Sequence, residues 1–173
     1  MRTIEILAVT TALVLSAVTE CASAAQTPSA QARPAPPTTY EAYVAAVWKA
    51  VHGKILEMAN DLPEDRYGWK PHPDSRSMLD EFRHVVIGLD VSSAEPRGEK
   101  FDYAALVKAL ESVVSRDAIV AEMERALAAS YLLVDAGPKP RLVWWLDHQA
   151  EHYGKLVSNC RASGLVPPIS RRR

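Results

Sequence analysis

Breaks marked by proline and glycine divide the chain from residue 40 to residue 164 into long segments whose apolar residues recur at spacings of three and four. This spacing places apolar side chains on one face of a helix, whereas a half-buried strand would alternate apolar and polar residues. No run of alternating residues is long enough for a sheet. The sequence therefore predicts an all-α fold, built as a four-helix bundle.

The expected helices follow from these breaks and from capping residues at their ends. They are expected at about 40–60, from Ser75 or Ser77 to about 95, from Asp102 to the break at 137–140, and at about 141–162. Ser77 followed by Asp80 resembles a capping box, and Gly164 is a natural C′ residue. The third segment is interrupted at 115–117, so it is either one long kinked helix or two consecutive helices.

The first 24 residues have the features of an export signal. Arg2 supplies the positive start, Ile6 to Val18 is an apolar run, and Ala22-Ser23-Ala24 is a small-residue cleavage pattern. The run is too short for a membrane span, which needs about 20 apolar residues. We expect a periplasmic or secreted protein with no membrane span after cleavage. The alternative is a disordered amphipathic tail.

The mature chain is then divided by composition. Residues 25–39 are expected to form a flexible Pro/Ala-rich linker, 40–168 the helical domain, and 169–173 a basic tail. Loss of the signal removes Cys21 and leaves Cys160 alone, so no internal disulfide can form. It also removes one Arg and two Glu from 20 basic and 21 acidic residues, which leaves equal numbers. A neutral chain gives no case for nucleic-acid binding; a homodimer stays open.

Two histidines four residues apart, His148 and His152, lie in the last expected helix. Residues at this spacing share a helix face, with Cβ atoms roughly 5–6 Å apart. Two neutral imidazoles held in this way can chelate one transition metal. The pair lies at the margin of the apolar arc of the helix. Histidines exposed to solvent would also lie there, so the spacing alone leaves both interpretations open.

The other three histidines give weaker signals. His52 lies beside the apolar stripe of the first helix and is expected to be a structural or surface residue. His72 stands between two prolines on an extended segment and is not expected to be a ligand. His84 lies nearly opposite the main apolar stripe of the second helix, on a thinner line with Ile87, Gly88 and Val91. Periodicity alone therefore does not select His84.

Four short motifs in order resemble the DinB/YfiT-like superfamily of small bundle metalloproteins. They are Met58-Ala59-Asn60-Asp61-Leu62-Pro63-Glu64-Asp65, then Trp69-Lys70-Pro71 with Arg76-Ser77-Met78 and His84-Val85, then His148-Gln149-Ala150-Glu151-His152-Tyr153-Gly154-Lys155-Leu156, and finally Arg161-Ala162-Ser163-Gly164-Leu165-Val166-Pro167-Pro168. The resemblance covers most of the mature chain. Lys155 departs from it, because Gln is usual there, and so does the stretch 90–95, which lacks the usual aromatic residues.

The resemblance implies a metal site and a particular bundle. Carried over by position, the metal ligands would be His84, His148 and His152. The helices would follow one another in a non-sequential order, with 94–101 crossing the end of the bundle. A site with three histidines and open positions is a known catalytic pattern. Zn²⁺ is the first expectation, with Ni²⁺ or Fe²⁺ as alternatives, because imidazole suits all three.

The reaction is defined only by class. The resemblance implies thiol-dependent transferases and isomerases, in which a low-molecular-weight thiol meets the metal, whereas export favours hydrolysis of a small-molecule substrate. Glu151 is a candidate general base, although a solvated residue would look the same. One alternative is a bundle that binds metal or a partner without catalysis. Another is an H-x-x-E-H metalloprotease with Glu151 as base. Cys160 lies about 12 Å beyond His152 along the helix and should be a small buried residue.

Overall fold

The computed structural model describes residues 35–171, and in this part of the chain the regular secondary structure is all helix, without a strand. Its six α-helices are α1 (Tyr40–Asp61), α2 (Met78–Ala94), α3 (Tyr103–Leu110), α4 (Arg116–Asp135), α5 (Pro140–Ala162) and α6 (Pro168–Arg171). Two 3₁₀ turns lie at Glu64–Arg66 and Glu95–Arg97. The all-α prediction is confirmed. The expected signal, most of the expected linker, and residues 172–173 lie outside the described residues.

Local hydrogen bonds explain where the helices begin and end. Ser77 caps α2, and its hydroxyl accepts from the backbone N–H of Asp80 at 3.1 Å, while the Asp80 carboxylate accepts from the backbone N–H of Ser77. The predicted capping box is therefore confirmed. The hydroxyl of Ser115 accepts from the backbone N–H of Ala118 and caps α4, so the third expected segment is two helices. Gly164 follows α5 with φ +83°, the left-handed conformation expected of a C′ glycine.

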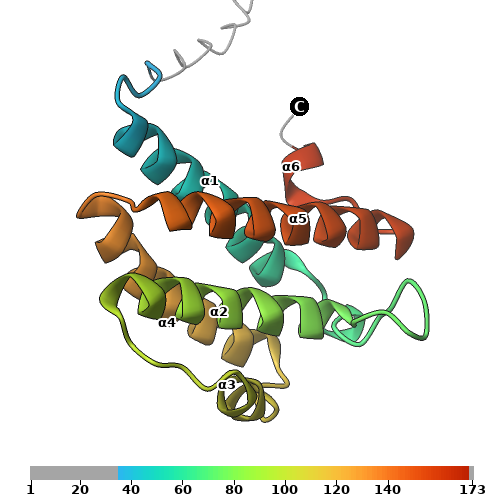
Figure 1. Cartoon of the computed structure of the whole chain (residues 1–173). Helices are drawn as coiled ribbons and strands as arrows, with labels where there is room; N and C mark the ends of the chain where they lie inside the picture. The colour runs from blue at the N-terminus through green and yellow to red at the C-terminus, as the bar shows by residue number, and fades with distance from the viewer. Residues whose placement is uncertain (1–34, 172–173) are drawn as a thin grey trace, which may run out of the picture. The chain divides into compact units, whose positions relative to one another are not determined.

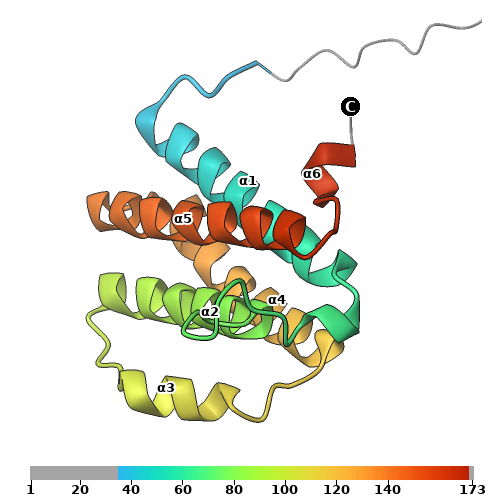
Figure 2. The ribbon, with the colours of Figure 1, turned by 90° about the vertical axis from the view of Figure 1, so that its right-hand side faces the viewer.

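The four long helices do not pack in chain order. α1 packs mainly against α4 and α5, and α2 packs mainly against the same two helices. The consecutive helices α1 and α2 therefore lie across the group from each other, joined by residues 62–77, and α4 is likewise joined to α5 by residues 136–139. The expectation that 94–101 crosses the end of the bundle is wrong: this segment leads into α3, which packs on the outside of α2 (Figure 2).

α2 is the most enclosed helix, because α4, α5 and α3 all contact it. Residues 85–89 and 91–94 are all buried, so the thin line that carries His84 is covered at Ile87, Gly88 and Val91, while His84 itself is partly exposed. α2 and α5 run antiparallel. Their contacts pair Glu81 with His152 and Glu95 with Arg141, one pair toward each end. The face of α2 on which periodicity did not select His84 is thus the face that meets α5.

The C-terminal end is tied to α1. The guanidinium of Arg171 donates hydrogen bonds to the carboxylate of Asp61 and to the carbonyl of Val166. Cys160 is buried nearby, as predicted, and burial raises the pKa of its thiol. Within residues 35–171, no helix combines the length and apolar character needed to cross a membrane.

Candidate metal centre

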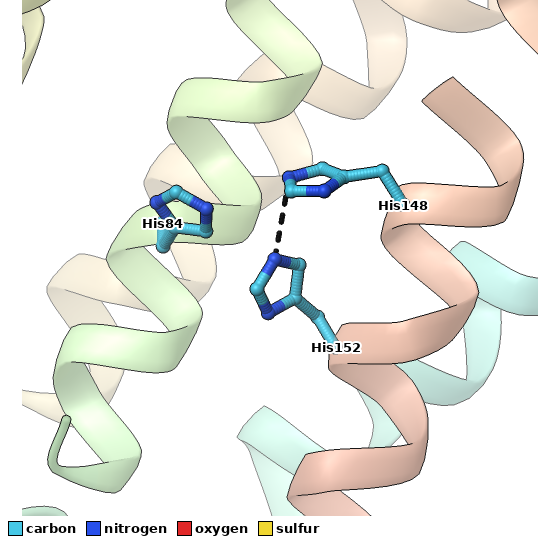
Figure 3. A group of neighbouring side chains, drawn as sticks. All are labelled: His84, His148 and His152. Carbon is cyan, nitrogen blue, oxygen red and sulfur yellow. Dashed lines mark hydrogen bonds between the residues drawn. The ribbon is translucent and has the colours of Figure 1, made fainter. Parts of the chain in front are cut away.

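His84 on α2 and the α5 pair His148 and His152 come together in one cluster (Figure 3). One ring nitrogen from each residue lies within 4.8 Å of the others. His152 is buried, while His84 and His148 are partly exposed. The three rings lie at centroid distances of 4.6–5.4 Å and at steep angles to one another, so no two of them are stacked. The spacing of the α5 pair left open whether His148 and His152 are ligands or solvent-exposed residues, and the resemblance implied all three positions.

The nitrogen spacing fits a tetrahedral ion. Nε2 of His148 and Nε2 of His152 lie 3.2 Å apart. Zn–N bonds of about 2.0–2.1 Å at the tetrahedral angle place two ligand nitrogens about 3.4 Å apart. The α5 pair therefore already has the required separation. The nitrogen of His84, within 4.8 Å of the others, needs to approach by at most about 1.4 Å.

A buried carboxylate orients one of the three rings. Nδ1 of His152 donates to Oε2 of Glu81 at 2.7 Å, and both side chains are buried. With its proton on Nδ1, His152 presents the lone pair of Nε2 to the cluster. A carboxylate that accepts from the remote nitrogen of a metal-binding histidine is the usual partner in such sites, because it fixes the tautomer and strengthens the ligand.

Sequence reasoning missed Glu81, although one signal was present. Glu81 stands three residues before His84 in a Glu-x-x-His arrangement, and residues three apart share a helix face. The same arrangement places carboxylate and imidazole together in metal sites of other helix bundles. Here the carboxylate reaches across to α5 and contacts His152. Burial alone would raise the pKa of Glu81, but the hydrogen bond from His152 and nearby positive charges lower it.

The electrostatic surroundings keep two of the imidazoles neutral. Burial, and then the positive charge of Arg76 and the neighbouring histidines, lower the pKa of His84 to about 4. Burial, and then the electrostatic interaction with His152, lower the pKa of His148. Neutral imidazole is the form that binds a metal. Both residues are therefore available as ligands at neutral pH.

Aromatic packing holds His148 from the other side. The indole of Trp144 stacks parallel to the His148 ring at a centroid distance of 5.8 Å, and the guanidinium of Arg141 lies 4.7 Å from the Trp144 ring. The indole N–H of Trp145 donates to Glu95 on the 3₁₀ turn after α2 at 2.8 Å. These contacts fix the first half of α5 against the end of α2.

A glycine allows α2 and α5 to approach closely beside the cluster. A Cβ at Gly88 would lie 2.5 Å from Nε2 of Gln149. That amide is fully buried and donates to the carbonyl of Val85 at 3.2 Å. Only a residue without a side chain leaves room for this bridge.

Two hollows adjoin the cluster. The first, about 260 Å³, lies between α2 and α3, and we call it the α2–α3 hollow. His84, Arg76, Ile87, Tyr103 and Val107 are among the residues that line it. The second, about 530 Å³, we call the polar hollow, and it is lined by Pro71, Asp74, Ser75, Arg76, Glu81, Lys155 and Asn159. A small molecule in the α2–α3 hollow would contact the exposed side of His84.

The remaining candidates lie outside the cluster. His52 is buried, which agrees with a structural rather than a surface role. His72 is exposed in the loop before α2. Glu151 is exposed on α5, and the carboxylate that touches a histidine of the cluster is Glu81 instead. Among the described residues, these three histidines are the group that can hold a metal ion.

Comparisons with known proteins give no assignment. No protein-family model matches the sequence, and neither the curated proteins nor the solved structures provide a match.

Proposed function

We propose that this protein binds a divalent transition metal through His84, His148 and His152 and uses it in catalysis. One observation carries the proposal: the three ring nitrogens lie within 4.8 Å of one another although they come from two helices. The Glu81 carboxylate on His152 supports it, because a buried carboxylate–histidine pair that aims a lone pair at two further histidines fits a ligand set.

The chemistry follows from the donor set. Three neutral histidines leave the ion its full charge and leave open positions for water or substrate. Zn²⁺ is our first choice, with Ni²⁺ or Fe²⁺ as alternatives. Such an ion activates water, polarises a carbonyl or holds a thiolate. We therefore propose a hydrolase or a thiol-dependent transferase that acts on a small molecule, because the hollow beside His84 is small.

We also propose that the chain belongs to the DinB/YfiT-like superfamily and is exported. The four motifs in order, the helix contacts that depart from chain order, and the position of the three histidines support the family assignment. The pattern of residues 1–24 supports export. Mass spectrometry of protein recovered from outside the cytoplasm tests the export proposal, because cleavage after Ala24 fixes the mass of the mature chain.

Elemental analysis tests the metal site. Protein purified without added chelator should carry about one metal ion per chain. His84→Ala and His148→Ala should each abolish it, because two histidines alone hold a divalent ion weakly. His72→Ala is the matched control, since His72 is exposed outside the cluster, and it should keep the metal. Stoichiometric metal in both His84→Ala and His148→Ala would remove the proposed site.

Two alternatives remain for the reaction. If the bundle binds metal or a partner without turnover, fully loaded protein will show no activity on panels of thiol-transfer and ester substrates. If instead the H-x-x-E-H segment acts as a protease, Glu151→Gln will abolish peptide hydrolysis while the metal stays bound. The exposure of Glu151 and the small hollows favour the small-molecule reaction over proteolysis.

A further inference from the structure

The loop before α2 brings a cation to the edge of the cluster. Arg76 lines both the α2–α3 hollow and the polar hollow. Its side chain is 45% exposed, and its Nη1 lies 3.8 Å from Oε1 of Glu81, beyond hydrogen-bond distance. The other oxygen of Glu81 already accepts from His152. Arg76 thus has most of its donors available for a ligand. Only Glu81 lies between it and His152 of the cluster.

The second arginine of the α2–α3 hollow is not available in this way. Arg83 donates to Asp80 and to the carbonyls of Glu111 and Val113. It therefore ties α2 to the end of α3. The same hollow is also lined by Asp80 and Glu111, so its two carboxylates balance the charges of its two arginines.

The polar hollow has a different composition. Lys155 on α5 lines it together with Arg76, and Ser75 and Asn159 add two uncharged hydrogen-bonding side chains. Of its two carboxylates, Glu81 is bound to His152, and Asp74 has a side chain that is 91% exposed and lies near His72. Two cations from different elements therefore face a hollow whose acidic groups are engaged or point to solvent.

We propose that the polar hollow binds the anionic group, a carboxylate or a phosphate, of the small molecule that reacts at the metal. Arg76 holds this group, and Lys155 on α5 adds a second positive charge. A planar guanidinium matches the two oxygens of such a group. The position of Arg76 on both hollows lets a molecule extend from the polar hollow toward His84. This inference depends on the metal site proposed above, and it defines the class of substrate.

A pair of thiols that differ only in charge tests the proposal. 3-Mercaptopropionate and 3-mercapto-1-propanol have the same carbon chain, and one ends in a carboxylate while the other ends in an alcohol. Each is titrated into the cobalt(II)-loaded protein, in which a bound thiolate gives a sulfur-to-metal absorption band. We expect the carboxylate to bind roughly tenfold more tightly, as a hydrogen bond to a charged group implies.

Substitutions locate the source of that preference. Arg76→Gln should remove most of the roughly tenfold preference, and Lys155→Gln a smaller part, while cobalt content stays at about one per chain. Arg66→Gln is the matched control, because Arg66 is 41% exposed, has a comparable ion pair at 3.7 Å and lines neither hollow. Competition by inorganic phosphate and by acetate distinguishes the two anions.

The outcomes separate the two proposals. Equal affinity for both thiols in fully loaded protein would overturn the anion site while leaving the metal site intact. An equal loss of preference in Arg66→Gln and Arg76→Gln would also overturn it, because the preference would then reflect net charge. Absence of cobalt binding would overturn the metal site, and the anion site beside it would fall as well.

Discussion

His52 and His152 are buried to the same degree, at 1% and 2% exposure, yet their surroundings differ. Nδ1 of His52 donates to the carbonyl of Trp48 on its own helix, and its Nε2 has no hydrogen-bond partner. Nδ1 of His152 donates to Glu81 on another helix, and its Nε2 faces His148. One ring is enclosed by the core, whereas the other is held between a carboxylate and a second histidine.

The difference shows that burial alone does not identify a functional histidine. The distinguishing feature is the hydrogen-bond partner of Nδ1, the ring nitrogen that would point away from a metal. A backbone carbonyl of the same helix accepts the one N–H of a neutral ring, and this hydrogen bond implies no further ligand. Burying a charged carboxylate beside the ring has a desolvation cost, and a histidine with a purely structural role does not require such a partner. The carboxylate becomes useful when the other nitrogen binds a cation.

Substitution by leucine should abolish metal binding at His152 and leave it unchanged at His52. His152→Leu removes a ligand and leaves the Glu81 carboxylate buried without its partner, so bound metal should fall from about one per chain to none. His52→Leu should keep the metal, because His52 lies outside the cluster. Elemental analysis of the two folded variants, checked by circular dichroism, measures this. Metal loss in folded His52→Leu would contradict the distinction between a structural His52 and a metal-binding His152.

The second expected effect concerns pH and His52. Burial lowers the pKa of His52 from 6.5 to about 4, partly offset by its hydrogen bond to Trp48. The unfolded chain takes up a proton below pH 6.5, whereas the folded chain does so only near pH 4. The free energy of unfolding should therefore fall by about 3 kcal/mol as pH drops through this window.

His52→Leu should remove this contribution. At pH 7 its stability should lie within about 1 kcal/mol of the parent, because an unpaired buried nitrogen is replaced by an apolar group. By pH 4 the variant should be the more stable by about 3 kcal/mol. Urea unfolding of both proteins across this range tests the difference, in which the other titrating groups cancel. Parallel curves would show that burial does not lower the pKa of His52 in the folded protein.

Features set by local sequence were predictable. The caps of α2 and α3, at Ser77 and Asp102, and the left-handed Gly164 depend on residues three or four positions apart. The metal-binding spacing of His148 and His152 is local for the same reason. Helix periodicity and short-range hydrogen bonds therefore indicated the long helical segments and the shared helix face of His148 and His152.

Features set by packing were not predictable in this way. His84 lies opposite the main apolar stripe of α2. An apolar stripe identifies the buried face of a helix only when the helix is covered on one side. α2 is covered on three sides, and the close contact at Gly88 turns the thin line toward α5. Glu81 was missed because its partner is 71 residues away on another helix. The resemblance supplied His84 but not this carboxylate.

The smallest effect is expected for Glu81→Gln. The amide oxygen of Gln can still accept from Nδ1 of His152, so the ring should keep its orientation while the negative charge is lost. The affinity for zinc should then fall roughly 10- to 100-fold, as for other carboxylate partners of metal-binding histidines. Competition with a chelating dye measures the affinity, and Glu124→Gln, an exposed carboxylate on α4, is the control. Unchanged affinity in Glu81→Gln would mean that packing alone orients His152, and the carboxylate would no longer distinguish this ring from His52.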